Sequence, residues 1–177
     1  IEAGIDTLEH LQGFSQEEMD LIVSHGVILV PTLTATKCTV DVGTAPQADP
    51  AKQQRFISWM QQNWRDKQAG MKRALAAGVR MAVGTDAGYA HCLHGANAYE
   101  MELLVQEGMS PMQGLVAATS TAAEALQLEE EIGSLRPGHY ADLLIVEGQP
   151  HVDISVLRDV NRIKAICKNG RFVKEAL

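Results

Sequence analysis

Two segments of this sequence end in side chains that could bind a metal ion. The stretch "IEAGIDTLEH" roughly alternates apolar and polar residues, as a β-strand does, and ends in Glu9 and His10. The stretch "VRMAVGTDAG" reads as another strand, with Asp86 at its tip. Imidazole nitrogen and carboxylate oxygen both suit zinc or a similar divalent ion. The pattern alone leaves two alternatives open, namely a hydrogen-bonded structural histidine at position 10 and an Asx-turn acid at position 86.

The loop after the second of these segments, "DAGYAHCLHGAN", carries further candidates. No base partner stands at a meaningful spacing from Cys92, so we interpret it as an inert loop thiol rather than a nucleophile. His91 is interpreted as facing solvent. A helical stretch earlier in the chain carries four large apolar residues that we interpret as packing residues: Phe56, Trp59, Met60 and Trp64.

The elements that position these residues follow the order β, α, β, α, β, α. Ser15 is the expected N-cap of a helix, with Glu18 as its capping-box partner and Gly26 at its end. The apolar run "VILVPTL" predicts a buried parallel strand. We expect a loop from Thr34 to about Pro50 and then a long helix that ends at Gly78. Parallel strands of this kind bring their carboxyl ends together, where barrel enzymes place their chemistry.

The remainder of the chain changes character at Gly133. Before it, Asn97 is a plausible helix cap with Glu100 as partner, and Ser110 caps a helix whose first residue is proline. After it come short strands with turn signals, and Asn169-Gly170 predicts a two-residue hairpin. The C-terminal part is therefore predicted to form a small β-rich appendage.

Composition and net charge narrow the classes of binding partner that the chain could have. The chain has 177 residues, 46% of them hydrophobic, and a net charge of −7 without a Lys/Arg cluster, which argues against nucleic acid and against anionic membrane. Small molecules or proteins remain. Three widely spaced cysteines favour a reducing compartment, and a cytoplasmic location is expected. No apolar run approaches the length of a membrane span.

Five motifs together resemble the C-terminal part of metal-dependent amidohydrolases: "GIDTLEH", "VGTDAG", "GMSPMQGLVAATSTAAEALQL", "GSLRPGHYADLLIVEGQP" and "IKAICKNGRFV". The nearest branch contains imidazolonepropionase-like and Xaa-Pro dipeptidase (prolidase-type) enzymes. The resemblance implies an α/β fold made of strands six to eight of a TIM-type (α/β)8 barrel plus part of a small β-sandwich domain. We expect residues 1–132 to form the barrel part and residues 133–177 the sandwich segment.

The same resemblance implies roles for individual residues. The family holds one or two metals through an HxH motif on the first strand, a carboxylated Lys on the fourth, a His on each of the fifth and sixth, and an Asp on the eighth. His10 then matches the sixth-strand ligand, and Asp86 the eighth-strand acid that also takes a proton from the attacking water. His94 resembles a position that faces the substrate, and a solvated loop residue is the alternative. The expected cofactor is one or two divalent metal ions, with zinc the first choice.

The chain departs from the family because the HxH motif, the fourth-strand Lys and the fifth-strand His have no counterpart in it. We therefore expect a fragment that is inactive alone and whose partner is the missing N-terminal half of the same protein; a homo-oligomer is left open. The expected activity is metal-dependent hydrolysis of amide bonds, first in dipeptides such as Xaa-Pro. Alternatives are a cyclic amidohydrolase of the imidazolonepropionase type, or a noncatalytic fragment or structural module.

Overall fold

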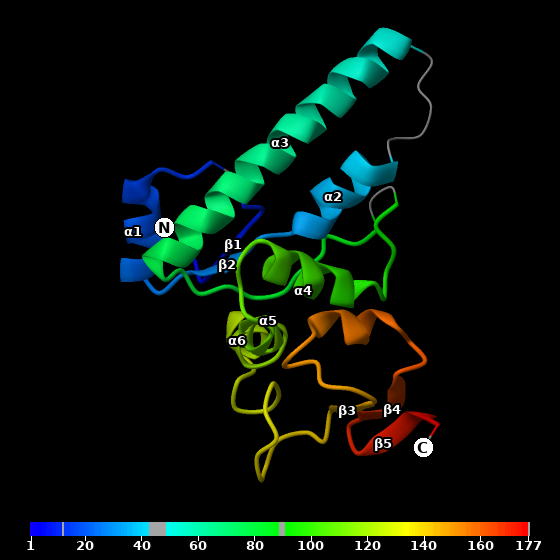
Figure 1. The fold of residues 1–177 in the computed structure, drawn as a ribbon. Helices are drawn as coiled ribbons and strands as arrows, with labels where there is room; N and C mark the ends of the chain where they lie inside the picture. The colour runs from blue at the N-terminus through cyan, green and yellow to red at the C-terminus, as the bar shows by residue number, and fades with distance from the viewer. Residues whose placement is uncertain (12, 43–48, 89–90, 177) are drawn as a thin grey trace.

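The computed structural model describes residues 1–11, 13–42, 49–88 and 91–176, and at its centre lie three parallel segments (Figure 1). Strand β1 (Thr7–Glu9) pairs in parallel with β2 (Ile28–Val30). The segment around Met81 continues the order through a single parallel bridge to Leu29. The predicted order and parallel direction are confirmed, although both strands are shorter than expected.

The third segment does not extend into a strand, because its hydrogen bonds change partner. Leu29 N donates to Arg80 O at 2.9 Å, and Ala82 N donates to Leu29 O at 2.9 Å. Val83 N then turns away from the sheet and donates to Ala117 O at 2.9 Å. The chain that leads to Asp86 is consequently held by a helix rather than by a strand ladder.

Two of the predicted helices have the expected ends. Helix α1 (Gln16–Ser24) begins with the capping box of Ser15 and Glu18. Helix α3 (Pro50–Ala77) is capped by Asp49 and ends at Gly78, whose left-handed φ of 74° only glycine adopts without strain. In Figure 1, α3 runs diagonally across the molecule, and only its second half lies over the strands.

The loop predicted between Thr34 and Pro50 is wrong in its first part. Helix α2 (Leu33–Val42) occupies it, and residues 43–48 lie outside the described residues. Threonine-rich sequence has low intrinsic helix propensity, so tertiary contacts decide here. The decisive contact is Glu100, whose carboxylate accepts hydrogen bonds from the first two N–H groups of α2.

The predicted cap of the next helix is also wrong. Helix α4 (Asn97–Gln106) starts without any side-chain cap, because Glu100 is fully buried and turned toward α2. In contrast, α5 (Pro111–Ala118) has the predicted Ser110 cap, and α6 (Ser120–Ala125) follows it.

The C-terminal residues form a second, antiparallel sheet with the order β3-β4-β5, as expected. Its strands are β3 (Leu143–Val146), β4 (Ile163–Lys168) and β5 (Arg171–Glu175), with a short 3₁₀ helix, η1 (Ile154–Arg158), between β3 and β4. The predicted hairpin is confirmed, because Asn169 and Gly170 both take positive φ, 49° and 74°, as a type I′ turn requires. In Figure 1 this sheet lies on the far side of α4 and α5 from the parallel strands.

The hydrophobic core packs β1 and β2 against α1, α3 and α4. Its fully buried members include Leu11, Met19, Ile22, Leu29, Leu33, Met71, Leu103 and Leu104. Within the described residues, no helix combines the length and the apolar character that crossing a membrane requires.

The end of α3 gives a test of this architecture. Replacing Gly78 by Ala forces an L side chain into a left-handed conformation, although its Cβ would meet no neighbour. We expect a loss of about 1 kcal/mol in the free energy of unfolding, measured by urea titration. Gly114→Ala is the control, because Gly114 lies inside α5, is not among the glycines of positive φ, and its Cβ would meet its nearest neighbour, Val105 Cγ2, at an ordinary contact distance of 3.4 Å. Equal effects of the two substitutions would contradict the assigned helix end.

Candidate active site

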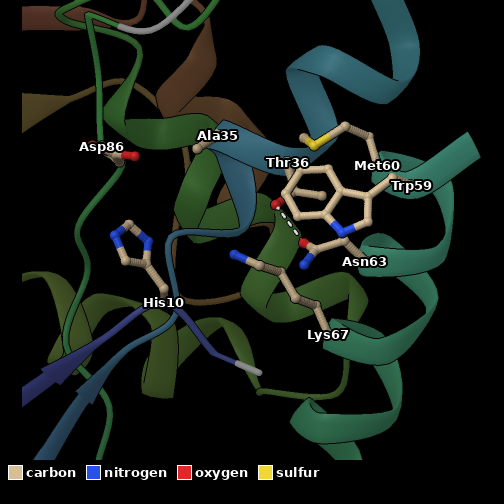
Figure 2. A pocket seen from close by; sticks show the side chains of 8 residues that line it. All are labelled: His10, Ala35, Thr36, Trp59, Met60, Asn63, Lys67 and Asp86. Atoms are coloured by element: carbon tan, nitrogen blue, oxygen red, sulfur yellow. Dashed lines mark hydrogen bonds between the residues drawn. The ribbon is translucent and has the colours of Figure 1, made fainter. Parts of the chain in front are cut away.

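A cavity of about 230 Å³ opens beside the carboxyl ends of the parallel segments. His10 and Asp86 lie on one side of it, and α3 forms the opposite wall (Figure 2). The cavity is lined by His10, Ala35, Thr36, Trp59, Met60, Asn63, Lys67 and Asp86. The fold therefore brings together the two residues that the sequence marked as metal ligands, although they are 76 positions apart in the chain.

The three parallel segments share an unusual backbone feature at their ends. His10, Thr32 and Asp86 all have positive φ, 64°, 49° and 53°. Non-glycine residues rarely adopt this region, and for a β-branched residue such as Thr32 it is an outlier that costs roughly 1–3 kcal/mol. Such strain persists only where the surroundings impose it, and it concentrates at functional sites.

The ring of His10 is oriented by a hydrogen bond. Its Nδ1 lies 2.8 Å from Thr32 Oγ1. Because Nδ1 is engaged in this bond, Nε2 is the nitrogen left for a ligand. An imidazole held through one nitrogen, with the other directed at a site, is the usual arrangement of a metal-binding histidine.

Lys67 is a site residue that the sequence analysis missed. Lys67 lies beside the cavity yet is only 4% exposed, and its ammonium group donates to Pro31 O at 3.1 Å and to Thr32 O at 3.0 Å. Burial lowers the pKa of Lys67 to about 8, while the negative charges of Glu100 and Asp86 act in the opposite direction. A signal was present in the sequence, since Lys67 stands at helical spacing between Met60, Met71 and Ala74, which form the buried stripe of α3.

Glu100 is the second missed residue, because its acid was assigned to capping its own helix. Its oxygens accept from Leu33 N at 2.8 Å, Thr34 N at 2.7 Å and Thr34 Oγ1 at 2.6 Å. Burial raises the pKa of Glu100, and these three donated bonds together with the charge of Lys67 oppose that rise. Because every donor points at the carboxyl oxygens, the geometry suits the ionised acid.

His94 lies in a different cavity from His10 and Asp86. This second cavity, of about 480 Å³, is lined by residues that include Cys38, His91, His94, Tyr99 and Arg158. The two sites are nevertheless close, because a Cβ built on Gly88, two residues after Asp86, would lie 3.2 Å from His94 Nε2. The structure therefore places His94 in the second cavity, beside the turn that follows Asp86, and not in the first cavity.

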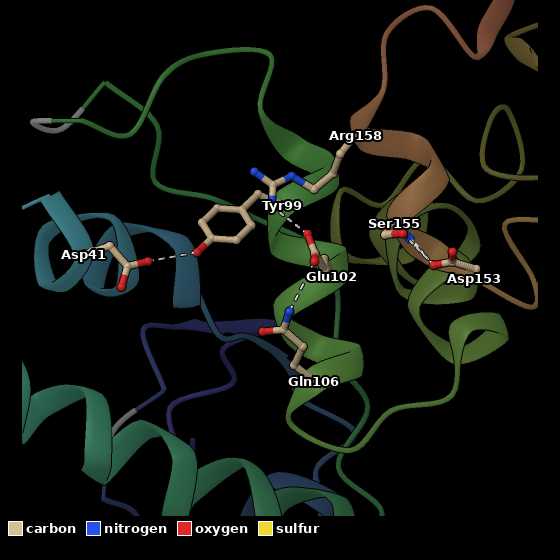
Figure 3. A network of polar contacts seen from close by, with 7 residues as sticks. All are labelled: Asp41, Tyr99, Glu102, Gln106, Asp153, Ser155 and Arg158. Atoms are coloured by element: carbon tan, nitrogen blue, oxygen red, sulfur yellow. Dashed lines mark hydrogen bonds and ion pairs between the residues drawn. The ribbon is translucent and has the colours of Figure 1, made fainter.

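One wall of the second cavity is a set of polar contacts between α2, α4 and η1 (Figure 3). The Arg158 guanidinium lies over the Tyr99 ring at 4.3 Å and donates to Glu102 at 2.7 Å. The Tyr99 hydroxyl donates to Asp41 at 3.3 Å, and burial raises the pKa of Tyr99 to about 12. These contacts attach the C-terminal appendage to the helices behind the site.

The other sequence interpretations have mixed outcomes. Cys92 is buried, and its thiol points at Thr85 O at 3.5 Å, in agreement with an inert residue. Met60 is buried and Trp64 packs against the core. The rings of Phe56 and Trp59 pack against each other with centroids 5.8 Å apart, but Trp59 is also 59% exposed and lines the first cavity, so the packing interpretation describes it only in part. It lies in the first half of α3.

The donor set of the first cavity suits a divalent cation. His10 and Asp86 supply an imidazole and a carboxylate, and both residues are exposed to the cavity. Among the described residues Asp86 has neither an ion pair nor a side-chain hydrogen bond, so its charge is available. The part of the chain that the structure describes nevertheless contains no group of three or more His, Cys, Asp or Glu arranged for a metal. Further ligands would have to come from elsewhere.

Comparison with known proteins agrees with this geometry. Residues 1–173 match the model of the "Amidohydrolase family". Ochratoxinase from Aspergillus niger is 27% identical over 183 residues, which cover 98% of this chain and 35% of that protein. Imidazolonepropionase from Geobacillus kaustophilus is 33% identical over 113 residues, which cover 60% of this chain and 26% of that protein.

A solved structure is similar over almost the whole chain. The crystal structure of a Xaa-Pro dipeptidase with methionine bound in the active site superposes with a TM-score of 0.85 and 31% identity. The match covers 98% of this chain and 41% of that one. The present chain thus spans between about a quarter and two fifths of these relatives.

The environment of Cys92 gives a pH prediction. Burial, with the neighbouring Cys38 thiol adding to it, raises the pKa of Cys92 to about 11. About one molecule in a thousand then carries the thiolate at pH 8, and the fraction rises about tenfold per pH unit up to pH 10. Iodoacetamide should therefore modify Cys92 slowly at pH 8 and faster as the pH rises, as measured by peptide mass spectrometry. The urea-unfolded chain is the control, and native modification at the unfolded rate would refute the buried environment.

Proposed function

Because this chain belongs to the amidohydrolase family, we propose that it forms part of a metal-dependent hydrolase of amide bonds. The observation that carries the proposal is the convergence of His10 and Asp86 on one cavity, at the ends of the two parallel segments that flank β2. The similarity to the Xaa-Pro dipeptidase over 98% of the chain supports it.

We propose that His10 and Asp86 hold one or two divalent ions, with zinc as the first choice because of the nitrogen and oxygen donors. When bound, such an ion supplies Lewis acidity that polarises a carbonyl group and makes water a nucleophile at neutral pH. A catalytic zinc normally has three protein ligands. The remaining ligands would come from an N-terminal half of the same protein, and this proposal is supported by the chain covering 41% of the dipeptidase.

Asp86 is proposed as the proton carrier of the reaction. Its carboxylate is free of partners among the described residues and can accept a proton from the attacking water. The same proton then passes to the nitrogen of the scissile bond, so that the amine leaves neutral. His10 serves as a ligand and not as a proton carrier in this scheme, because its Nδ1 is engaged with Thr32 and its Nε2 is the proposed metal ligand.

The proposed substrates are dipeptides, with Xaa-Pro as the first choice. The opposite wall of the cavity offers the exposed ring of Trp59 as an apolar surface, and the amide of Asn63, whose oxygen accepts from Thr36 at 3.2 Å, as a polar contact (Figure 2). His94 is proposed to contact the part of the substrate that reaches past Gly88 into the second cavity. The similarity to imidazolonepropionase favours cyclic amides as the second candidate class.

We further propose that residues 1–132 form strands six to eight of an (α/β)8 barrel, with the helices that follow them. Residues 133–177 belong to a composite β-sandwich in this proposal. Parallel pairing in the first part and antiparallel pairing in the second support this division. The exposed apolar residues of the small sheet, among them Leu144 and Phe172, would be covered by strands from the N-terminal half.

Replacing Asp86 by Asn in the full polypeptide tests the proton-carrier role. The amide keeps an oxygen ligand but cannot accept the proton, so hydrolysis of Xaa-Pro dipeptides should fall by roughly 10²–10⁴-fold. Zinc content, measured by mass spectrometry, should fall much less. Asp20→Asn is the control, because Asp20 is exposed on α1 and lies outside both cavities. An Asp86→Asn protein that retained full turnover would refute the role.

Complementation tests whether the chain works alone. The 177 residues should bind zinc weakly and hydrolyse neither dipeptides nor cyclic amides, because two ligands do not build a catalytic site. They should also associate, since β1 presents an unpaired edge. Adding the N-terminal half in trans should restore zinc binding and hydrolysis. A soluble, active, monomeric fragment would overturn this prediction, and a complemented assembly without zinc or activity would favour the structural-module alternative.

A further inference from the structure

A continuous set of hydrogen bonds connects the interior between α3 and α4 to the ring of His10. We propose that Lys67 and Glu100 are positioning residues that clamp the Pro31–Thr34 turn, and that Thr32, held by this clamp, fixes the His10 ring so that Nε2 faces the cavity. The inference rests on the proposed function in that it takes His10 to be a metal ligand. In this role Lys67, Glu100 and Thr32 act through the ring of His10 and supply no ligand to the metal.

The clamp matches the polarity of the turn at both of its ends. The Lys67 ammonium donates to the carbonyl oxygens of Pro31 and Thr32, at 3.1 and 3.0 Å. The Glu100 carboxylate accepts from the N–H groups of Leu33 and Thr34, at 2.8 and 2.7 Å. A cation therefore binds the acceptors and an anion binds the donors, and the anion also lies at the N-terminus of α2, where negative charge is favoured.

Lys67 has no capacity left for a substrate carboxylate. An ammonium group has three N–H donors. Lys67 Nζ donates to Pro31 O and Thr32 O and lies 3.4 Å from Thr32 Oγ1, so three oxygens of the turn surround the three donors. The side chain is also 4% exposed. Its position beside the cavity is thus explained by support of the turn rather than by substrate binding.

The backbone of Thr32 shows what the clamp achieves. Thr32 is 3% exposed and has a φ of 49°, a conformation that glycine or asparagine would adopt at lower cost. In this conformation its hydroxyl lies 2.8 Å from His10 Nδ1. When Nε2 binds a cation, Nδ1 carries the ring proton and donates a hydrogen bond to Thr32 Oγ1. The strained backbone therefore serves to present an acceptor to the ring.

Two substitutions at Thr32 separate the hydroxyl from the shape of the side chain. Thr32→Val removes the hydroxyl and keeps the branched volume, whereas Thr32→Ser keeps the hydroxyl. In the full polypeptide, Thr32→Val should weaken zinc binding about 10–100-fold, measured by competition with a chromophoric chelator. Thr32→Ser should stay within about threefold of the original protein, which is below the range seen on losing such a partner. Equal zinc affinity of the Val and Ser variants would overturn the inference.

Lys67→Met tests the clamp, with Lys72→Met as its control. Lys72 is exposed on the same helix and five residues further along. Zinc affinity should fall about 10–100-fold for Lys67→Met and remain unchanged for Lys72→Met. If Lys67→Met does not fold, as judged by circular dichroism, the comparison at Thr32 still decides the inference. A folded Lys67→Met protein with unchanged zinc affinity would contradict the clamp.

A metal-free measurement distinguishes failure of the inference from failure of the proposed function. In the ¹⁵N-histidine NMR spectrum of the metal-free polypeptide, the His10 ring should show one tautomer and a slowly exchanging Nδ1 proton. Both features should be lost in Thr32→Val and kept in Thr32→Ser. If His10→Ala leaves zinc binding intact while the ring signals behave as expected, the proposed ligand role fails and the positioning holds. If His10→Ala abolishes zinc binding but the ring signals do not respond to Thr32→Val, the inference fails alone.

Discussion

The structure around the site depends on one buried arrangement, the opposed charges of Lys67 and Glu100 on either side of the turn after β2. Burying either charge alone would be costly, and truncating one member of such a pair leaves the other uncompensated. Here each charge is satisfied by main-chain groups, so the desolvation is offset by directed hydrogen bonds. The same bonds satisfy the first N–H groups of α2 and hold Thr32 in its left-handed conformation.

This arrangement explains how a short stretch of strand supports a precise site. Strands β1 and β2 are three residues each, and the third segment contributes only one bridge. A ladder of that size would leave the ends of the strands mobile. The residues at the ends are instead fixed from the side, His10 by the hydroxyl of Thr32 and the segment before Asp86 by the bond from Val83 to Ala117. Rigid helices thus supply the support that the strands lack, which is what a preorganised ligand set needs.

The two cavities lie close to each other, since Gly88, two residues after Asp86, adjoins His94 of the second cavity. One contains His10 and the exposed ring of Trp59, and the other contains His94 beneath the contact of Arg158 with Tyr99. Because Arg158 belongs to η1, between two strands of the appendage, the C-terminal segment forms part of the wall behind the site.

The sequence by itself determined the features that depend on local chemistry. Alternation, capping boxes and turn residues gave the parallel segments, the ends of α1, α3 and α5, and the hairpin, and the motifs gave His10 and Asp86 as one candidate pair. Only the tertiary structure decided the features that depend on partners distant in sequence. Helix α2 forms in a stretch of low helix propensity because Glu100, 66 residues after Thr34, accepts hydrogen bonds from its first amides. Lys67 can stand in an apolar stripe because its ammonium group donates to carbonyl oxygens of the turn after β2. The periodicity of apolar residues indicates which face of a helix is buried. It does not indicate which main-chain N–H and C=O groups lie at that face without a hydrogen-bond partner.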